Sequence, residues 1–82
     1  MERFTILVQG KNYELIVGEY YIIDYFDDDI SFQGLEAKVE DTFWKDDGKT
    51  FFFIWVPEHN EDYLVSDVEI RSIFLKGAEN YE

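Results

Sequence analysis

The sequence predicts an all-β fold, a small antiparallel barrel of five or six strands. Short runs with apolar residues at every second position recur along the chain, and turn residues separate them roughly every 8 to 12 positions. No apolar pattern supports a long helix. The 82 residues form one small domain. Eight Phe, six Tyr and two Trp supply the apolar area that its core needs.

The N-terminal part predicts a hairpin followed by a third strand. Residues 4–8 and 13–17 alternate apolar and polar side chains, and residues 9–12 carry a turn signal between them. Residues 20–26 are rich in β-branched and aromatic side chains, as strands are. Strand propensity then falls at three consecutive aspartates, so we expect a long acidic loop that ends at Gly34.

A half-buried strand is expected from Leu35, where apolar and charged residues alternate. Asp41 falls on the inward-facing parity just before Phe43, so a β-bulge near Asp41 is needed to restore the register. The Asp-Gly pair within residues 46–49 predicts the tight turn of a second hairpin.

Residues 51–56 are apolar at every position, which is typical of a central strand covered on both faces. Pro57 cannot donate a hydrogen bond to a sheet and ends this strand. We expect one of two alternating pairs to face the core, either Phe53 and Trp55 or Phe52 and Ile54.

Residues 66–76 admit a helix or a strand. Ser66 and Glu69 have capping-box spacing, but the apolar positions form an imperfect helical stripe. We favour one short helical turn, capped by Ser66 or Asp67, followed by a closing strand from Ile70.

No repeat, linker or change of composition divides the chain, so residues 1–82 are predicted to form one acidic domain with a flexible polar tail over 76–82. The absence of cysteine excludes a disulfide scaffold and a thiolate zinc site. No signal-like segment opens the sequence, and no apolar run approaches the length of a membrane helix. We therefore expect a cytoplasmic protein that does not enter a membrane.

From about residue 18 to residue 75, the order of elements resembles that of Tudor-like and KOW-type small barrels. The shared order is a strand leading into a long acidic loop, a tight Asp-Gly hairpin, and a strand, short turn and strand in the segment YLVSDVEIRSI, residues 63–73. This resemblance implies a domain that binds peptides, modified side chains or nucleic acid. The nucleic-acid-binding members are usually basic, and this chain is not.

The formal net charge is −12, from 19 acidic and 7 basic residues. Solubility of a small domain calls for a magnitude of only about 2 to 8. Same-face carboxylates on a strand lie about 6.6 Å apart, similar in scale to neighbouring phosphates of a nucleic acid. The charge therefore favours a non-enzymatic inhibitor that occupies a basic, nucleic-acid-binding surface of another protein and does not itself bind nucleic acid. In size and charge it resembles the DNA-mimic and anti-defence proteins of phages. An acidic surface that serves solubility alone is the competing interpretation.

More than half of the net charge lies between residues 24 and 47. We expect the acids of this segment to form one partner-binding patch on one side of the sheet, and to contribute little to folding. The candidate residues are Asp24, Asp27, Asp28, Asp29, Glu36, Glu40, Asp41, Asp46 and Asp47.

Catalytic and metal chemistry find little support. The single histidine, His59, has acidic neighbours that give at most a weak metal site, and Asp27 to Asp29 lack the spacing of an EF-hand loop. No nucleophile–base pair or phosphate-binding glycine loop is recognisable. We expect no catalytic residue, no metal and no cofactor.

The aromatic residues support two further hypotheses. One is a Tudor-like adaptor in which two to four aromatic side chains cage a basic or methylated side chain of a peptide. The other is a structural subunit that uses an aromatic face as an oligomer interface. The candidate cage residues are Tyr20, Tyr21, Tyr25, Phe26, Trp44, Trp55 and Tyr63.

Overall fold

Seven strands and one short 3₁₀ turn make up the computed structural model, which describes residues 2–77. No α-helix occurs in that range, so the all-β prediction is confirmed, but the described strands form a five-stranded sheet and a separate hairpin and not one closed barrel. The elements are β1 (Arg3–Val8), β2 (Lys11–Ile16), β3 (Tyr20–Phe26), β4 (Ser31–Asp46), β5 (Lys49–Val56), β6 (Glu61–Ser66), η1 (Asp67–Glu69) and β7 (Ile70–Leu75).

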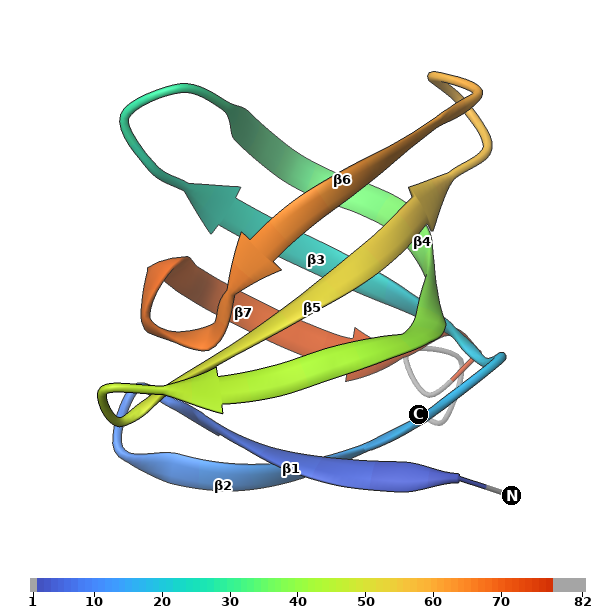
Figure 1. Ribbon diagram of the computed structural model, residues 1–82. Coiled ribbons are helices and arrows are strands. Elements are labelled where there is room, and N and C mark those ends of the chain that lie inside the picture. Colours follow the sequence, from blue (N-terminus) through green and yellow to red (C-terminus); the bar gives the residue numbers. More distant parts are fainter. Residues whose placement is uncertain (1, 78–82) are drawn as a thin grey trace.

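The strands form two sheets. Strands β1 and β2 pair as the predicted N-terminal hairpin, and the other five form an antiparallel sheet in the order β6-β5-β4-β3-β7. Figure 1 shows the hairpin below this strongly curved sheet, with β7 at the back. The edge strands of the five-stranded sheet are β6 and β7, and neither has a second partner in the part of the chain that the structure describes.

Strand β4 holds the five-stranded sheet together because it pairs with β3 along its first half and with β5 along its second half. The predicted bulge is present: between the pairs Val39–Ile54 and Phe43–Phe52, β4 advances four residues while β5 advances two. The extra residues turn Asp41 out into solvent and let β4 bend at this point.

The prediction of a long loop that ends at Gly34 is wrong. Strand β4 begins at Ser31, and only residues 27–30 separate it from β3. The low strand propensity of three aspartates is overridden because Asp27 closes a tight turn and Phe32 is buried in the core. Gly34 lies within the strand at φ 63°, where the register between β3 and β4 shifts.

The core lies between the concave face of the sheet and the hairpin. Phe52 and Ile54 of β5 are fully buried, which decides between the two predicted pairs. Phe4 of β1 stacks on Phe43 with ring centroids 4.2 Å apart and also contacts Phe52, with centroids 5.4 Å apart. These contacts attach the hairpin to the bent half of β4 and to β5.

The predicted helical turn and closing strand are confirmed as η1 and β7, but the capping role is different. Ser66 makes no side-chain capping hydrogen bond. Asp67 is 3 % exposed, and its carboxylate accepts hydrogen bonds from the backbone N–H groups of Leu7 and Thr50, both at 3.1 Å. Asp67 thus joins the turn to β1 and to β5.

The described chain ends just beyond β7. The backbone N–H of Lys76 donates a hydrogen bond to the Tyr20 carbonyl, and the Lys76 side chain forms an ion pair with Glu36. Residues 78–82 of the predicted tail lie outside the described residues. Within the described range, the structure has no helix that could span a membrane.

Candidate protein-binding surfaces

The nine predicted acidic residues do not share one end of the molecule. The turn over residues 27–30 and the turn over residues 46–49 both lie at the left in Figure 1, whereas the bend of β4 lies at the right. Asp41 at this bend and Asp46 are five residues apart on one strand, which corresponds to about 16 Å. The acids are therefore divided between two ends of the sheet.

Asp27 is a structural residue of the first turn. One carboxylate oxygen accepts hydrogen bonds from the backbone N–H groups of Asp29 and Ile30, at 2.7 and 2.8 Å. The other accepts a hydrogen bond from the Tyr25 hydroxyl at 2.7 Å. The hydrogen bonds from Ile30 and Tyr25 hold the pKa of Asp27 below its ordinary value. These contacts lead us to expect that Asp27, unlike the exposed acids, contributes to folding.

Two further predicted acids have partners within the chain. Asp24 accepts a hydrogen bond from the backbone N–H of Gly34 at 2.6 Å, which fixes the irregular part of β4. Glu36 pairs with Lys76 at 3.0 Å. The predicted acids that are exposed, and that form no ion pair with a described residue, are Asp28, Asp29, Asp41, Asp46 and Asp47.

A strip of aromatic side chains covers the outward face of β5. Phe51, Phe53 and Trp55 alternate with the buried residues of the strand and are half-buried. Trp44 of β4 stacks on Phe51 at a centroid distance of 5.7 Å, and Leu64 of β6 lies opposite Phe53. Trp44 and Leu64 are 41 % and 44 % exposed. We call these five residues the outer strip.

Two carboxylates lie on the outer strip. Asp62 of β6 is the register partner of Trp55, and Glu40 of β4 approaches it from the other side of β5. Partial burial raises the pKa of Glu40, and the hydrogen bond and negative charge of Asp62 raise it further. Lys38 offsets part of this effect, but no ion pair joins either carboxylate to a described base. The spacing of the sequence does not reveal this pair because the residues are on different strands.

The predicted cage aromatics are distributed over several places. Tyr21 and Tyr25 are buried, and burial raises the pKa of both hydroxyls. Tyr20 and Phe26 already face cations of the same chain, since Lys76 and Arg71 lie 6.0 Å from their ring centres. Trp44 and Trp55 belong to the outer strip.

Tyr63 belongs to a separate cluster with Phe32 and His59. The ring of Tyr63 lies edge-on to Phe32 at 4.9 Å and to His59 at 5.8 Å, and its hydroxyl is 2.9 Å from His59 Nδ1. The rings are in mutual contact, which leaves little room between them for a cation. Among the described residues, no group of three or more acids and histidines is arranged to hold a metal ion.

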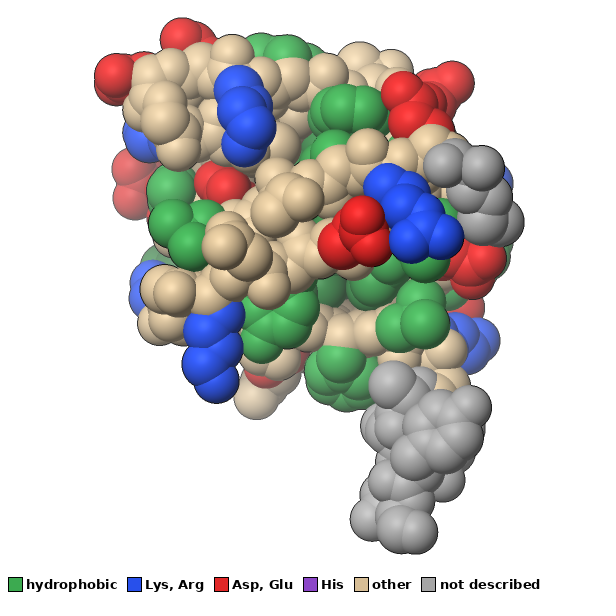
Figure 2. Space-filling model, turned by 90° about the horizontal axis from the view of Figure 1, so that it is seen from below, with side chains coloured by type: hydrophobic (Ala, Val, Ile, Leu, Met, Phe, Trp, Pro, Cys, Tyr) green, Lys and Arg blue, Asp and Glu red, His purple; other side chains and the backbone are tan. Residues whose placement is uncertain are grey.

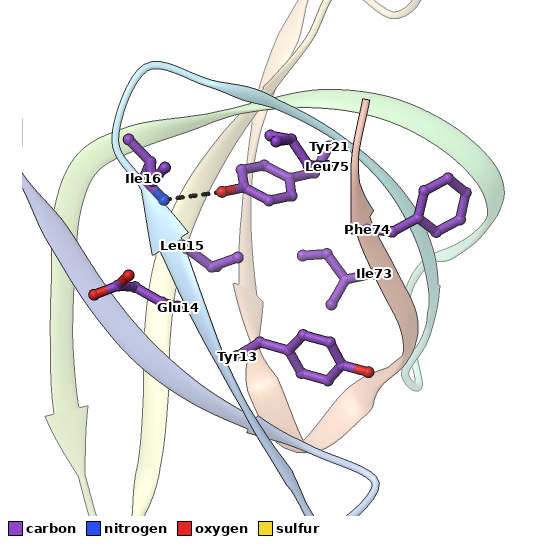
Figure 3. Close-up of a pocket in the computed structure, with 8 residues that line it drawn as sticks. All are labelled: Tyr13, Glu14, Leu15, Ile16, Tyr21, Ile73, Phe74 and Leu75. Atoms are coloured by element: carbon purple, nitrogen blue, oxygen red, sulfur yellow. Dashed lines mark hydrogen bonds between the residues drawn. The ribbon is translucent and has the colours of Figure 1, made fainter. Parts of the chain in front are cut away.

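A groove separates β2 from β7 and was not anticipated from the sequence. A cavity of about 280 Å³ is lined by Tyr13, Leu15 and Ile16 on one side and by Ile73 and Leu75 on the other (Figure 3). A second cavity of about 390 Å³ continues it toward Lys11 and Arg71, and the two cavities share Tyr13, Ile73 and Phe74. Figure 2, which views the hairpin side, shows hydrophobic side chains on this face with both basic and acidic side chains around them.

Comparison with known proteins gives no guide to the function of these surfaces. The chain matches no protein-family model, no curated protein and no solved structure.

Proposed function

We propose that the protein is a non-enzymatic, acidic protein-binding domain that covers a basic, nucleic-acid-binding surface of a partner and blocks it. A phage anti-defence protein would act in this way. The net charge of −12 supports this proposal because a field of one sign attracts a basic surface and repels nucleic acid.

The observation that carries the proposal is the outer strip together with Glu40 and Asp62. Protein interfaces commonly combine an aromatic centre with charged residues around it, and the aromatic residues contribute most of the binding energy. Here Asp62 lies opposite Trp55 on β6 and Lys38 lies opposite it on β4, while Glu40 contacts Asp62; neither carboxylate forms an ion pair with a described base. An arginine or lysine of the partner would neutralise both and pack against the indole ring.

The exposed acids at the two turns extend this surface. Asp28, Asp29, Asp46 and Asp47 would add long-range attraction, which raises the association rate more than the final affinity. A partner that holds a nucleic-acid backbone presents a row of basic side chains, so one bound protein could occupy several of its phosphate sites.

A Tudor-like adaptor that binds a basic or methylated peptide is the second candidate. The sheet order β6-β5-β4-β3-β7, the bent β4 and the turn before β7 are consistent with a small barrel of that kind. The cluster of Tyr63, Phe32 and His59 lies beside Glu61, whose carboxylate is 3.4 Å from the Tyr63 hydroxyl. The close packing of these rings places this candidate second.

Affinity capture from a host lysate followed by competition tests the proposal. We expect the captured partner to be a nucleic-acid-binding protein, to lose its DNA or RNA when this protein binds, and to release it as salt is added. The double variant Glu40→Gln with Asp62→Asn should weaken the complex at least tenfold. The matched control, Glu58→Gln with Glu61→Gln, removes the same charge from the turn before β6 and from the first residue of β6, and should bind almost normally.

Two results would contradict the proposal. A ternary complex with the nucleic acid still bound would show that the protein does not replace phosphates. Binding to a methylated peptide that is lost on Tyr63→Ala, but not on the Glu40 and Asp62 changes, would favour the adaptor.

A further inference from the structure

We propose that the groove between β2 and β7 binds an extended peptide of a partner protein, which adds to β7 as a further strand and places an acidic side chain between Lys11 and Arg71. This site is separate from the outer strip, and it does not depend on the function proposed above.

Strand β7 has a free hydrogen-bonding edge along the groove. It pairs with β3, and the hydrogen bond from the Lys76 N–H to the Tyr20 carbonyl shows which residues face that partner. Bonding alternates along an antiparallel pair, so the backbone groups of Ile73 and Leu75 point away from β3. They therefore do not bond to β3. Leu75 is 40 % exposed and Ile73 is 5 % exposed, so an added strand reaches Leu75 directly and Ile73 only where the groove opens.

Strand β2 has a free edge on the opposite side of the groove. The Ile16 N–H donates to the Tyr21 hydroxyl at 3.0 Å, and the Ile16 carbonyl accepts a hydrogen bond from Glu19. The backbone N–H and C=O of Ile16 thus point away from β1. Because hydrogen bonding alternates along an antiparallel pair, the backbone groups of Asn12 and Glu14 point the same way. No bond from these two backbones to a described residue lies outside the β1–β2 pair.

The side chains on the two walls repeat the same order. Along β2, Lys11 is followed at alternate positions by Tyr13 and Leu15; along β7, Arg71 is followed by Ile73 and Leu75. The two basic residues line one end of the groove, and the two leucines line the other. Strands β2 and β7 therefore run in the same direction, and one added strand can be antiparallel to both.

Charge complementarity defines the peptide. Arg3 and Lys76 form ion pairs with Glu14 and Glu36, whereas Lys11 and Arg71 form none with any described residue. Arg71 lies over the Phe26 ring at 6.0 Å, but neither base has a carboxylate partner, and two such bases at one end of an apolar groove favour an anionic side chain there. A peptide antiparallel to β7 meets Leu75 first and Arg71 last, so its pattern is apolar, any, apolar, any, acidic.

The two edge strands of the five-stranded sheet, β6 and β7, differ in how many charged residues they carry. Natural proteins protect free edges with charged residues. The edge strand β6 carries two charges, Glu61 and Asp62, whereas β7 carries one, Arg71, and presents Ile73 and Leu75 beside the groove. An apolar edge with a side-chain groove next to it is the usual setting for peptide binding by strand addition.

The test uses the full chain and a labelled probe peptide, Ser-Val-Thr-Leu-Thr-Asp-Ser, in a fluorescence-anisotropy titration. We expect saturable binding that weakens at least tenfold in the double variant Lys11→Glu with Arg71→Glu. The control double variant Lys38→Glu with Lys49→Glu has the same net charge, but its changes lie on β4 and β5, and it should bind within twofold of the unmodified protein. A probe with Lys in place of Asp should bind the Lys11→Glu, Arg71→Glu variant more tightly than it binds the unmodified protein.

Backbone pairing is tested separately. In the complex, the amides of Ile73 and Leu75 should become protected from hydrogen exchange. N-methylation of every second peptide residue should abolish binding for one of the two alternating sets of residues, the set whose N–H groups face β7, and not for the other. Absence of probe binding up to millimolar concentration, or binding that the groove variant leaves unchanged, would overturn the proposal. It would also be overturned if sedimentation showed a dimer that the groove variant separates, because the groove would then hold a second copy of the chain.

Discussion

The two faces of β5 have almost the same composition but different environments. Phe52, Ile54 and Val56 point inward and are fully buried, whereas Phe51, Phe53 and Trp55 point outward and are half-buried. The inward face packs against Phe4 of the hairpin and belongs to the core, while the outward side chains remain partly exposed. An apolar strand can therefore support both a core and a binding surface, and the structure around it decides which face does which. Carboxylates divide in the same way, into those that accept hydrogen bonds within the protein and those that face solvent.

The largest expected difference is between Phe52 and Phe53. Phe52→Ala should lower the free energy of unfolding by about 3 to 5 kcal/mol because it leaves a cavity in the core. Phe53→Ala removes a half-buried cross-strand contact and should cost about 1 kcal/mol or less. Urea denaturation measures both. Equal costs would show that the outward face is also core, and that it is not a partner surface.

The buried carboxylate Asp67 should have the next largest effect. Asp67→Ala leaves the N–H groups of Leu7 and Thr50 without their acceptor, which should cost about 2 to 4 kcal/mol and loosen the hairpin. Hydrogen exchange at these two amides, together with urea denaturation, checks this expectation. Glu69→Ala, in the same turn, is the control and should be nearly silent. If Asp67→Ala left the Leu7 amide protected, the hairpin would not depend on this contact.

Asp27 and Asp28 are adjacent but should behave differently. Asp27→Ala removes the acceptor that closes the turn and should cost about 1 to 2 kcal/mol, comparable with the loss of a helix cap. Asp28→Ala should be neutral or slightly stabilising because it lowers the excess of negative charge. Because the folded-state pKa of Asp27 is lowered, its contribution is present at neutral pH and should be lost as acid protonates it. Thermal melts of both variants at pH 7 and pH 3 measure the difference between them. Equal melting temperatures of the two variants at pH 7 would contradict this prediction.

The smallest effect on stability is expected at Glu40. Its pKa in the folded protein is raised above the ordinary value of 4.5, so the folded state holds the proton more tightly and the free energy of unfolding falls as pH rises through this range. Glu40→Gln removes the carboxylate and with it this loss of stability at higher pH. It should therefore raise the melting temperature slightly at pH 7, but not at pH 4. Glu58→Gln should show no such dependence on pH. A lower melting temperature for Glu40→Gln at pH 7 would mean that Glu40 stabilises the fold.

Local sequence patterns determined most of the elements of this protein. Alternation specified the hairpin, the Asp-Gly pair specified the β4–β5 turn, and the parity of Asp41 specified the bulge, because each signal depends on residues a few positions apart. The early start of β4 was missed because its signal, the burial of Phe32, arises from contacts distant in sequence.

Composition determined that the chain is acidic and aromatic, but only the tertiary structure decided what each acid and each aromatic residue does. Asp27 and Asp67 are structural because backbone N–H groups lie next to them, one within a turn and the other across two sheets. Glu40 meets Asp62 across β5, and the groove forms where β2 and β7 lie side by side with free edges. These arrangements depend on strand order and register, which bring together residues that no local pattern links.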